Sequence, residues 1–171
     1  MQELIKSISN RSLLTQIRNL KRQAQQDQIQ RILAACVVTH NNKILMIQRS
    51  RSDDFLPGYL EIPGGNVKAD EHILMGAKRE LFEETGILAS DSFSYVGSFD
   101  AVSPDGKKVR QFIFLTKSFS NNIRLSQEHD RYVWLDFIEL EKIPTNKILA
   151  KLKQTIIAAA KQIKSPTPAL R

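Results

Sequence analysis

One predicted helix, residues 71–85, limits the folds open to this chain because its apolar stripe also contains an acidic residue. Asp70 is the expected N-cap, and Gly86 is the expected C-terminal stop. The apolar positions recur at helical spacing and are Ile73, Leu74, Ala77 and Leu81. At about 100° per residue, Glu84 falls within the same stripe. The helix must therefore pack against a core and bury a carboxylate as it does so.

Three carboxylates gather near the end of this helix. Glu80, Glu83 and Glu84 occupy positions i, i+3 and i+4, so their side chains converge on one face. Like charges repel, and Arg79 is placed to pair mainly with Glu83. A bound divalent ion would relieve the repulsion, and oxygen ligands without Cys or His favour Mg²⁺ or Mn²⁺. The alternative is a solvated acidic helix face after an ordinary turn.

Strand-like segments surround the helix and predict an α/β fold. The expected strands are Ile32–Thr39, Ile44–Gln48, Tyr59–Ile62, Phe93–Val102, Val109–Lys117 and Arg131–Leu135. Asn41-Asn42 predicts a hairpin between the first two, and Pro104-Asp105-Gly106 predicts a second hairpin. Pro63-Gly64-Gly65 is expected to terminate the third strand.

The two ends of the chain are expected to form helices outside the central domain. The length of 171 residues suits one globular domain. We expect residues 1–30 to form a helical N-terminal extension, residues 31–144 the domain, and residues 145–171 a C-terminal helix and a short tail. The N-terminal helix could pack on its own domain or against a second copy, which leaves a homodimer open.

The net charge of +7 is concentrated at the two ends of the chain. Residues 1–31 hold six basic and two acidic side chains, residues 145–171 hold six basic and none acidic, and residues 32–144 hold thirteen and sixteen. Basic helical flanks are most often solvated, so nucleic acid is a secondary expectation that only these flanks would support.

The sequence suggests neither a membrane span nor a disulfide. No apolar run approaches the roughly 18 residues that a span needs, and the N-terminus lacks a secretory apolar segment, so a cytoplasmic protein without membrane contact is expected. The single cysteine, Cys36, lies in an apolar run and is interpreted as a small core residue, with a catalytic thiol as the minority alternative.

The spacing within the central segment resembles the Nudix box of the Nudix hydrolases. The pattern is Gly65, five residues, Glu71, seven residues, Arg79-Glu80-Leu81, one residue, Glu83-Glu84, one residue, and Gly86-Ile87. The resemblance extends to Arg49, Pro57-Gly58-Tyr59 and Glu61-Ile62-Pro63-Gly64-Gly65, over about residues 32–144. Lys68 and Asp70 stand where many members have an acid and a glycine, but neither is an inferred metal ligand.

The resemblance implies a fold and a set of site residues. The fold is a Nudix-type α/β/α sandwich with a mixed sheet, here with added N- and C-terminal helices. The implied catalytic residues are Glu71, Arg79, Glu80, Glu83 and Glu84. The three helix glutamates would bind metal together with the Gly64 carbonyl, Glu71 and Arg79 would form a supporting ion pair, and Glu80 would orient or deprotonate water.

A further metal ligand is expected just before the late strand that contains Trp134. Glu128 is our choice, Asp130 is the alternative, and a plain solvated acid remains open for both. Candidate phosphate contacts are Arg49, Arg51, Lys68 and Arg110, each of which surface exposure would equally explain.

The implied reaction is Mg²⁺-dependent hydrolysis of a phosphoanhydride (pyrophosphate) bond in a nucleoside diphosphate derivative. Nucleoside triphosphates, including oxidised ones, are the first expected substrates. ADP-ribose or nucleotide sugars come second, and capped or triphosphorylated RNA third. A non-catalytic regulatory domain that only binds nucleotides is the alternative from another class.

Overall fold

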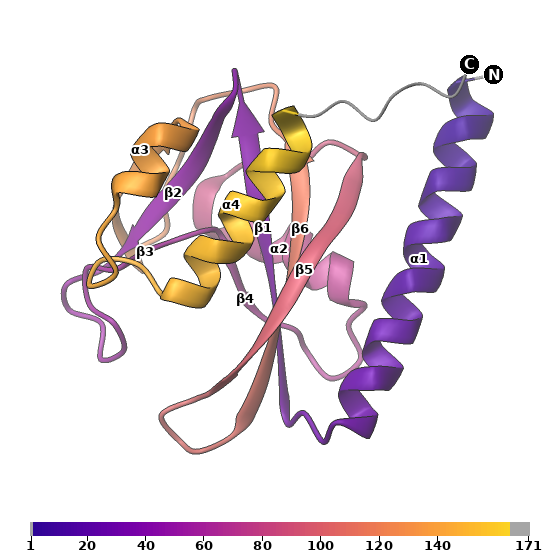
Figure 1. The fold of residues 1–171 in the computed structure, drawn as a ribbon, viewed down its shortest axis with the longest axis horizontal. Helices are drawn as coiled ribbons and strands as arrows, with labels where there is room; N and C mark the ends of the chain where they lie inside the picture. Colours follow the sequence, from indigo (N-terminus) through magenta and orange to yellow (C-terminus); the bar gives the residue numbers. More distant parts are fainter. Residues whose placement is uncertain (1, 165–171) are drawn as a thin grey trace.

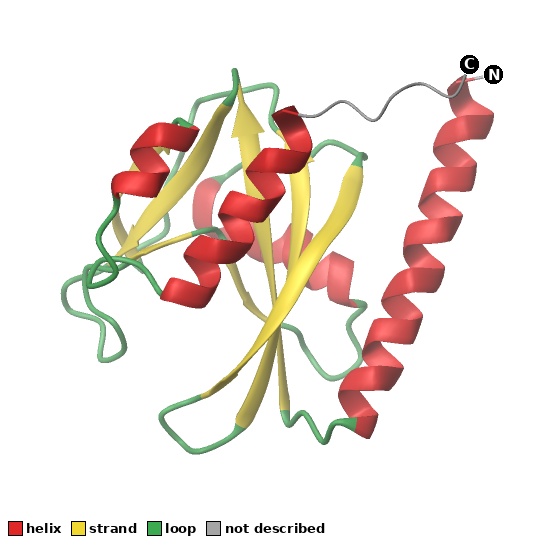
Figure 2. Cartoon of the chain, in the orientation of Figure 1, coloured by secondary structure: helices red, strands yellow, loops and turns green. Residues whose placement is uncertain are grey.

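The computed structural model describes residues 2–164, with side chains from Arg11 to Lys161. A mixed sheet lies between α2 on one face and α3 and α4 on the other, and α1 runs along the side (Figures 1 and 2). The elements are α1 (Gln2–Gln26), β1 (Arg31–His40), β2 (Lys43–Arg49), β3 (Leu60–Glu61), β4 (Gly64–Asn66), α2 (Ile73–Thr85), β5 (Phe93–Val102), β6 (Lys108–Lys117), β7 (His129–Leu135), α3 (Phe137–Lys142) and α4 (Ala150–Lys164). The expected α/β/α sandwich with a mixed sheet is confirmed.

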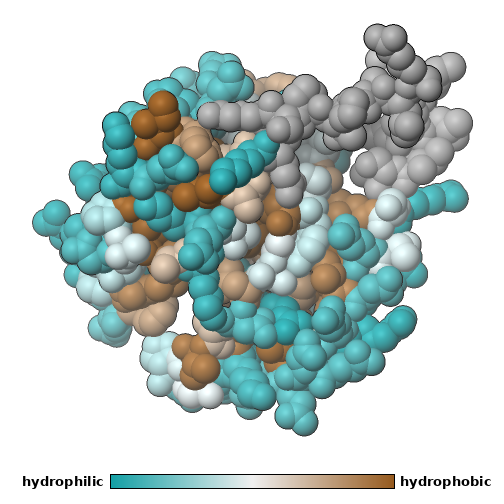
Figure 3. All heavy atoms as spheres, in the orientation of Figure 1, coloured by the Kyte–Doolittle hydropathy of each residue, from teal (hydrophilic) through white to brown (hydrophobic). Residues whose placement is uncertain are grey.

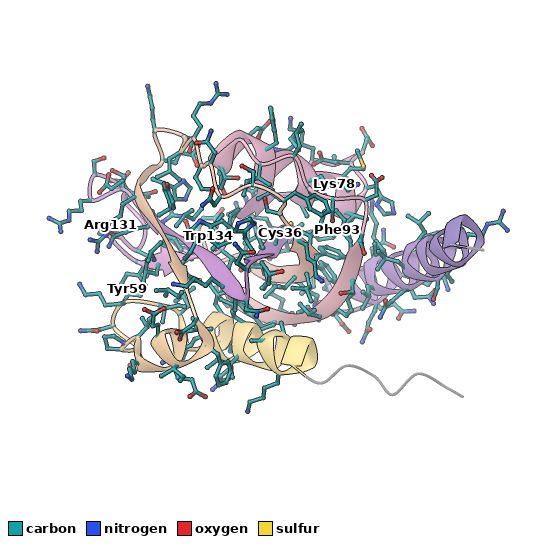
Figure 4. All side chains as sticks on the ribbon, turned by 90° about the horizontal axis from the view of Figure 1, so that it is seen from above. Cys36, Tyr59, Lys78, Phe93, Arg131 and Trp134 are labelled. Atoms are coloured by element: carbon teal, nitrogen blue, oxygen red, sulfur yellow. The ribbon has the colours of Figure 1, made fainter. Side chains whose placement is uncertain are left out.

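The centre of the sheet is β1, which pairs in parallel with β6 along most of its length. The strand order is β3-β2-β1-β6-β5, with β4 on β1 and β7 on β2. Six consecutive residues of β1, Ala34 to Thr39, are buried, as expected for a strand covered on both faces. Cys36 is one of them, and burial raises the pKa of its thiol to about 12. Figure 4 labels it in the interior, which agrees with the core interpretation.

The first hairpin is present, but its strands soon part. Asn41 and Asn42 both adopt positive φ, as a two-residue hairpin turn requires. β1 and β2 then pair only at Thr39 and His40. Farther along, β1 pairs with β4 and β2 pairs with β3, so the segment Leu60–Asn66 crosses from one strand to the other. This divergence opens the space in which the acidic residues meet.

The predicted end of α2 is confirmed, whereas its predicted start is wrong. Gly86 is the left-handed C-cap, with φ of 70°, and its N–H donates to the Phe82 carbonyl. The helix begins at Ile73 after His72, which makes no side-chain cap, so Asp70 is not the N-cap. The Glu71 carboxylate folds back instead to accept the N–H of Lys68.

Other parts of the secondary structure also differ from the prediction. The third strand, β3, ends before Pro63 as expected, but Gly64–Asn66 forms an additional strand, β4, on β1. The short α3 was not expected, although Asp136 and Glu139 form a capping box at its start. Ile148 is buried before α4 begins and bridges to Leu60. The expected tail lies outside the described residues.

Two hydrophobic clusters lie on opposite faces of the sheet. One contains α2 and buried residues of α1, namely Leu13, Ile17 and Ala24. The other contains α3 and buried residues of α4, namely Leu152, Ile156, Ala159 and Ala160. Figure 3 shows apolar side chains gathered over α3, surrounded by hydrophilic ones. Both terminal helices therefore contribute buried side chains to the core.

Additional contacts tie the outer elements to this frame. The Lys78 ammonium on α2 lies 4.9 Å from the centre of the Phe93 ring on β5, and the two side chains lie side by side in Figure 4.

Within residues 2–164, no helix is both long and apolar enough to cross a membrane.

We predict that Leu81→Ala will lower the free energy of unfolding by about 2–5 kcal/mol, because Leu81 is fully buried between α2 and the sheet. Met75→Ala on the same helix is the control. Its side chain is exposed, so the change should be within about 0.5 kcal/mol. Urea unfolding measures both, and equal losses would contradict the assigned face.

Candidate active site

Glu71, Glu80, Glu83 and Glu84 form the acidic cluster of the box. Glu84 is its buried member, with 6% of the residue exposed. Its Oε2 accepts the backbone N–H of Gly64 at 2.8 Å. Burial raises the pKa of this carboxyl to about 9, the Gly64 bond lowers it, and the nearby charges of Glu61, Glu80 and Glu128 raise it further. Glu84 therefore retains a proton at neutral pH when no cation is present.

The pair Gly64-Gly65 is required by close approach on two sides. A Cβ at Gly64 would lie 2.5 Å from Ala35 Cα and 2.6 Å from the Ala34 carbonyl oxygen, both in β1. A Cβ at Gly65 would lie 2.6 Å from the Glu80 carboxyl carbon. One glycine therefore lets the segment reach the sheet, and the next leaves room for a carboxylate above the backbone.

Arg79 organises the other acids of the box. Its guanidinium binds both oxygens of Glu71 at 2.8 Å, Glu80 at 2.7 Å and Glu83 at 2.9 Å, and it also donates to the Asn66 carbonyl. The expected ion pair with Glu71 is present. Hydrogen bonds from Arg79 are the main cause that lowers the pKa of Glu71 to about 2.

A second arginine holds acids that the sequence argument did not assign to the site. Arg49 binds Glu61 at 3.1 Å and also pairs with Asp53. His129 Nε2 lies 3.1 Å from Glu61 Oε1 and 3.8 Å from Glu84 Oε1. Glu61 and His129 therefore extend the cluster beyond the box.

An irregularity in β7 brings His129 to this position. Gln48 pairs with Arg131, but Arg49 pairs with His129, so Asp130 is an extra residue in the ladder. The bulge turns the His129 side chain inward, leaving it 1% exposed. Asp130 instead accepts the backbone N–H of Arg51. No local sequence signal could have revealed this pairing.

Glu128 and Asp130, the two candidates for the additional acid, lie in different settings. Glu128 lies in the exposed turn immediately before β7, and its charge acts on Glu84. Its backbone carbonyl accepts the N–H of Ser50, which fixes the turn against the end of β2.

The four candidate phosphate contacts fall into two groups. Arg49 is bound to Glu61 and Asp53, and Arg110 is bound to Asp100 and Asp27. Arg51 and Lys68 are exposed, and neither forms an ion pair within the described chain. Arg49 and Arg110 are thus occupied by acidic partners, whereas Arg51 and Lys68 are exposed.

Residues 30–156 match the family model described as the NUDIX domain. The chain belongs to the Nudix hydrolase family. The match covers the whole sheet, α2, α3 and the first part of α4, and thus every residue of the acidic cluster.

Similar proteins agree with this assignment. The uncharacterized Nudix hydrolase YfcD of Escherichia coli is 41% identical over 86 residues, covering 48% of this chain and 47% of YfcD. The 8-oxo-dGTP diphosphatase of Buchnera aphidicola is 38% identical over 76 residues, covering 43% and 57%. The chain thus spans about half the length of these curated relatives.

Solved structures support the fold. The MutT protein from Methanosarcina mazei aligns with a TM-score of 0.68 at 22% identity, covering 79% of this chain and 96% of that protein.

The acidic cluster of this Nudix domain has the donor chemistry of a hard-cation site. Arg79 does not reach Glu84, and no arginine or lysine pairs with Glu84 elsewhere in the described residues. Within that same part of the chain, no three acidic, histidine or cysteine side chains form a ready-made cage. Mg²⁺ commonly uses one or two protein carboxylates with waters and substrate phosphates, so the residues fit such an ion.

We predict that Gly64→Ala and Gly65→Ala will differ in stability. A methyl group at Gly64 meets backbone, so we expect a loss of about 1–3 kcal/mol or more. At Gly65 it meets the end of a flexible side chain, and the change should be within about 1 kcal/mol. Urea unfolding of both variants tests the difference, and the reverse order would contradict the packing of β4 on β1.

Proposed function

We propose that this protein hydrolyses a phosphoanhydride bond in a nucleoside diphosphate derivative and that hydrolysis depends on Mg²⁺. One observation carries the proposal: the buried Glu84 carboxyl lies near the charges of three other acids and pairs with no arginine or lysine in the described chain. Such a group either keeps a proton or binds a cation, and binding releases the proton.

Glu80, Glu83 and Glu84, with the Gly64 carbonyl and Glu128, are the proposed metal ligands. When bound, a divalent ion neutralises phosphate oxygens and lowers the pKa of a coordinated water. Mn²⁺ is a possible substitute because it shares the preference for oxygen ligands.

The remaining roles belong to the chain's own side chains. Glu80 lies above Gly65 and is the proposed group that orients or deprotonates water. Arg79 and Glu71 hold Glu80 and Glu83 in place through the observed ion pairs. Arg51 and Lys68 are the preferred contacts for substrate phosphates.

A nucleoside triphosphate, including an oxidised one, is the first proposed substrate. The similarity to a protein named 8-oxo-dGTP diphosphatase supports this order. ADP-ribose and nucleotide sugars come second, and RNA with a capped or triphosphorylated end comes third. A regulatory domain that only binds nucleotides is less favoured, because all glutamates of the box are present and Glu80 lies close enough for its charge to act on Glu84.

We predict hydrolysis of at least one compound from these classes, and loss of turnover on exhaustive chelation with EDTA. Chromatographic separation of the products, with and without Mg²⁺, is the measurement. Recovery of activity when Mg²⁺ is restored is the control for denaturation. Nucleotide binding without products would favour the regulatory alternative, and full turnover after chelation would exclude metal dependence.

We predict that Glu84→Gln will lower turnover by roughly 10²-fold or more, because the charge needed to hold a cation is removed. In EDTA its stability should match that of the parent protein, since the amide is uncharged like the protonated carboxyl and can still accept the Gly64 N–H. Thermal unfolding and turnover test the two parts.

Glu141→Gln is the matched control, because Glu141 is exposed on α3 and should affect neither measurement. A nearly fully active Glu84→Gln protein, or one that is strongly destabilised in EDTA, would make Glu84 a structural residue.

A further inference from the structure

His129 is a buried polar residue that lies outside the box. It is the first residue of β7, and its side chain is 1% exposed. A buried imidazole normally needs partners for both ring nitrogens, and here both are supplied. Nε2 lies 3.1 Å from Glu61 Oε1, and Nδ1 lies 3.3 Å from the Ser126 hydroxyl.

The contact with Glu61 defines the direction of one hydrogen bond. The Glu61 carboxylate can only accept, so Nε2 carries the proton that is donated to it. Nδ1 lies within hydrogen-bond distance of the Ser126 hydroxyl, which can either donate or accept. The backbone N–H of Ser126 donates to the Glu84 carbonyl, so this arrangement is anchored to the end of α2.

Glu61 is held by two side chains, Arg49 and His129. The Arg49 guanidinium donates to both of its oxygens from the end of β2, and His129 donates to Oε1 from the side where Glu84 lies. Without His129, the Glu61 side chain would keep its bonds to Arg49 but would lose its partner on the side of Glu84.

We propose that His129 is a positioning residue that keeps Glu61 beside Glu84 and thereby sets the affinity of the acidic cluster for a divalent ion. The proposal rests on the proposed function, because it assumes that this cluster binds metal. Residues that orient the ligands of a metal site typically change its affinity by about 10–100-fold when they are replaced.

The test measures Mn²⁺ binding to the full chain without substrate, from the EPR signal of free Mn²⁺. His129→Leu fills similar space but cannot donate, so the dissociation constant should rise about 10–100-fold. His129→Gln can place an amide N–H near the position of Nε2 and should retain most of the affinity. His40→Leu is the control, because His40 contacts Ser118 at the opposite end of β2 and should leave Mn²⁺ binding unchanged.

Glu61→Gln guards against failure of His129→Leu to fold, which circular dichroism would reveal. This change keeps an acceptor for His129 but removes the charge, so Mn²⁺ binding should weaken in the same direction. Unchanged affinity in folded His129→Leu, or in Glu61→Gln where His129→Leu does not fold, would overturn the proposal. A parent chain that binds no Mn²⁺ would overturn it too.

The outcomes separate this inference from the proposed function. If the parent chain binds Mn²⁺ but hydrolyses no nucleotide, the proposed reaction fails, and the variants still decide the role of His129. If the parent chain hydrolyses a nucleotide and folded His129→Leu binds Mn²⁺ equally well, only the positioning role fails.

Discussion

The close approach of Gly64 to β1 is the constraint on which the acidic cluster depends. Because no side chain separates Gly64 from Ala34 and Ala35, the segment after β3 joins the sheet as β4. Its N–H then reaches Glu84 on α2, and Gly65 leaves space for Glu80. The divergence of β1 and β2 provides the room, so the sheet itself determines where Gly64 and Gly65 meet α2.

The charge of the cluster is divided between two arginines. Arg79 binds Glu71, Glu80 and Glu83, and Arg49 binds Asp53 and Glu61. Glu84 lies between the two groups and is bound to neither. Burial away from both arginines raises the pKa of Glu84 to about 9, whereas the hydrogen bonds of Arg79 lower the pKa of Glu71 to about 2. Glu84 is thus the buried acid of the cluster that has no arginine or lysine partner in the described residues.

Features set by local sequence were predictable, and features set by distant contacts were not. The apolar stripe of α2, its Gly86 stop and both hairpins depend on neighbouring residues, and all of them are confirmed. The predicted start of α2 was wrong because the Glu71 side chain bonds to Arg79 and to the Lys68 N–H. The capping signal of α3 was visible, but six residues are too few for a periodic pattern. His129 was missed because its place depends on a bulge opposite Arg49.

The pairing of β4 with β1 also bears on hydrogen exchange. Val67 N–H donates to the Ile32 carbonyl, and Cys36 N–H donates to the Pro63 carbonyl, so both flanks of Gly64-Gly65 are bonded to the central strand β1. Amides in such a ladder open only when the surrounding strands open with them, whereas amides of surface loops exchange locally. The backbone beside the acidic cluster therefore belongs, in its dynamics, to the slowly exchanging core.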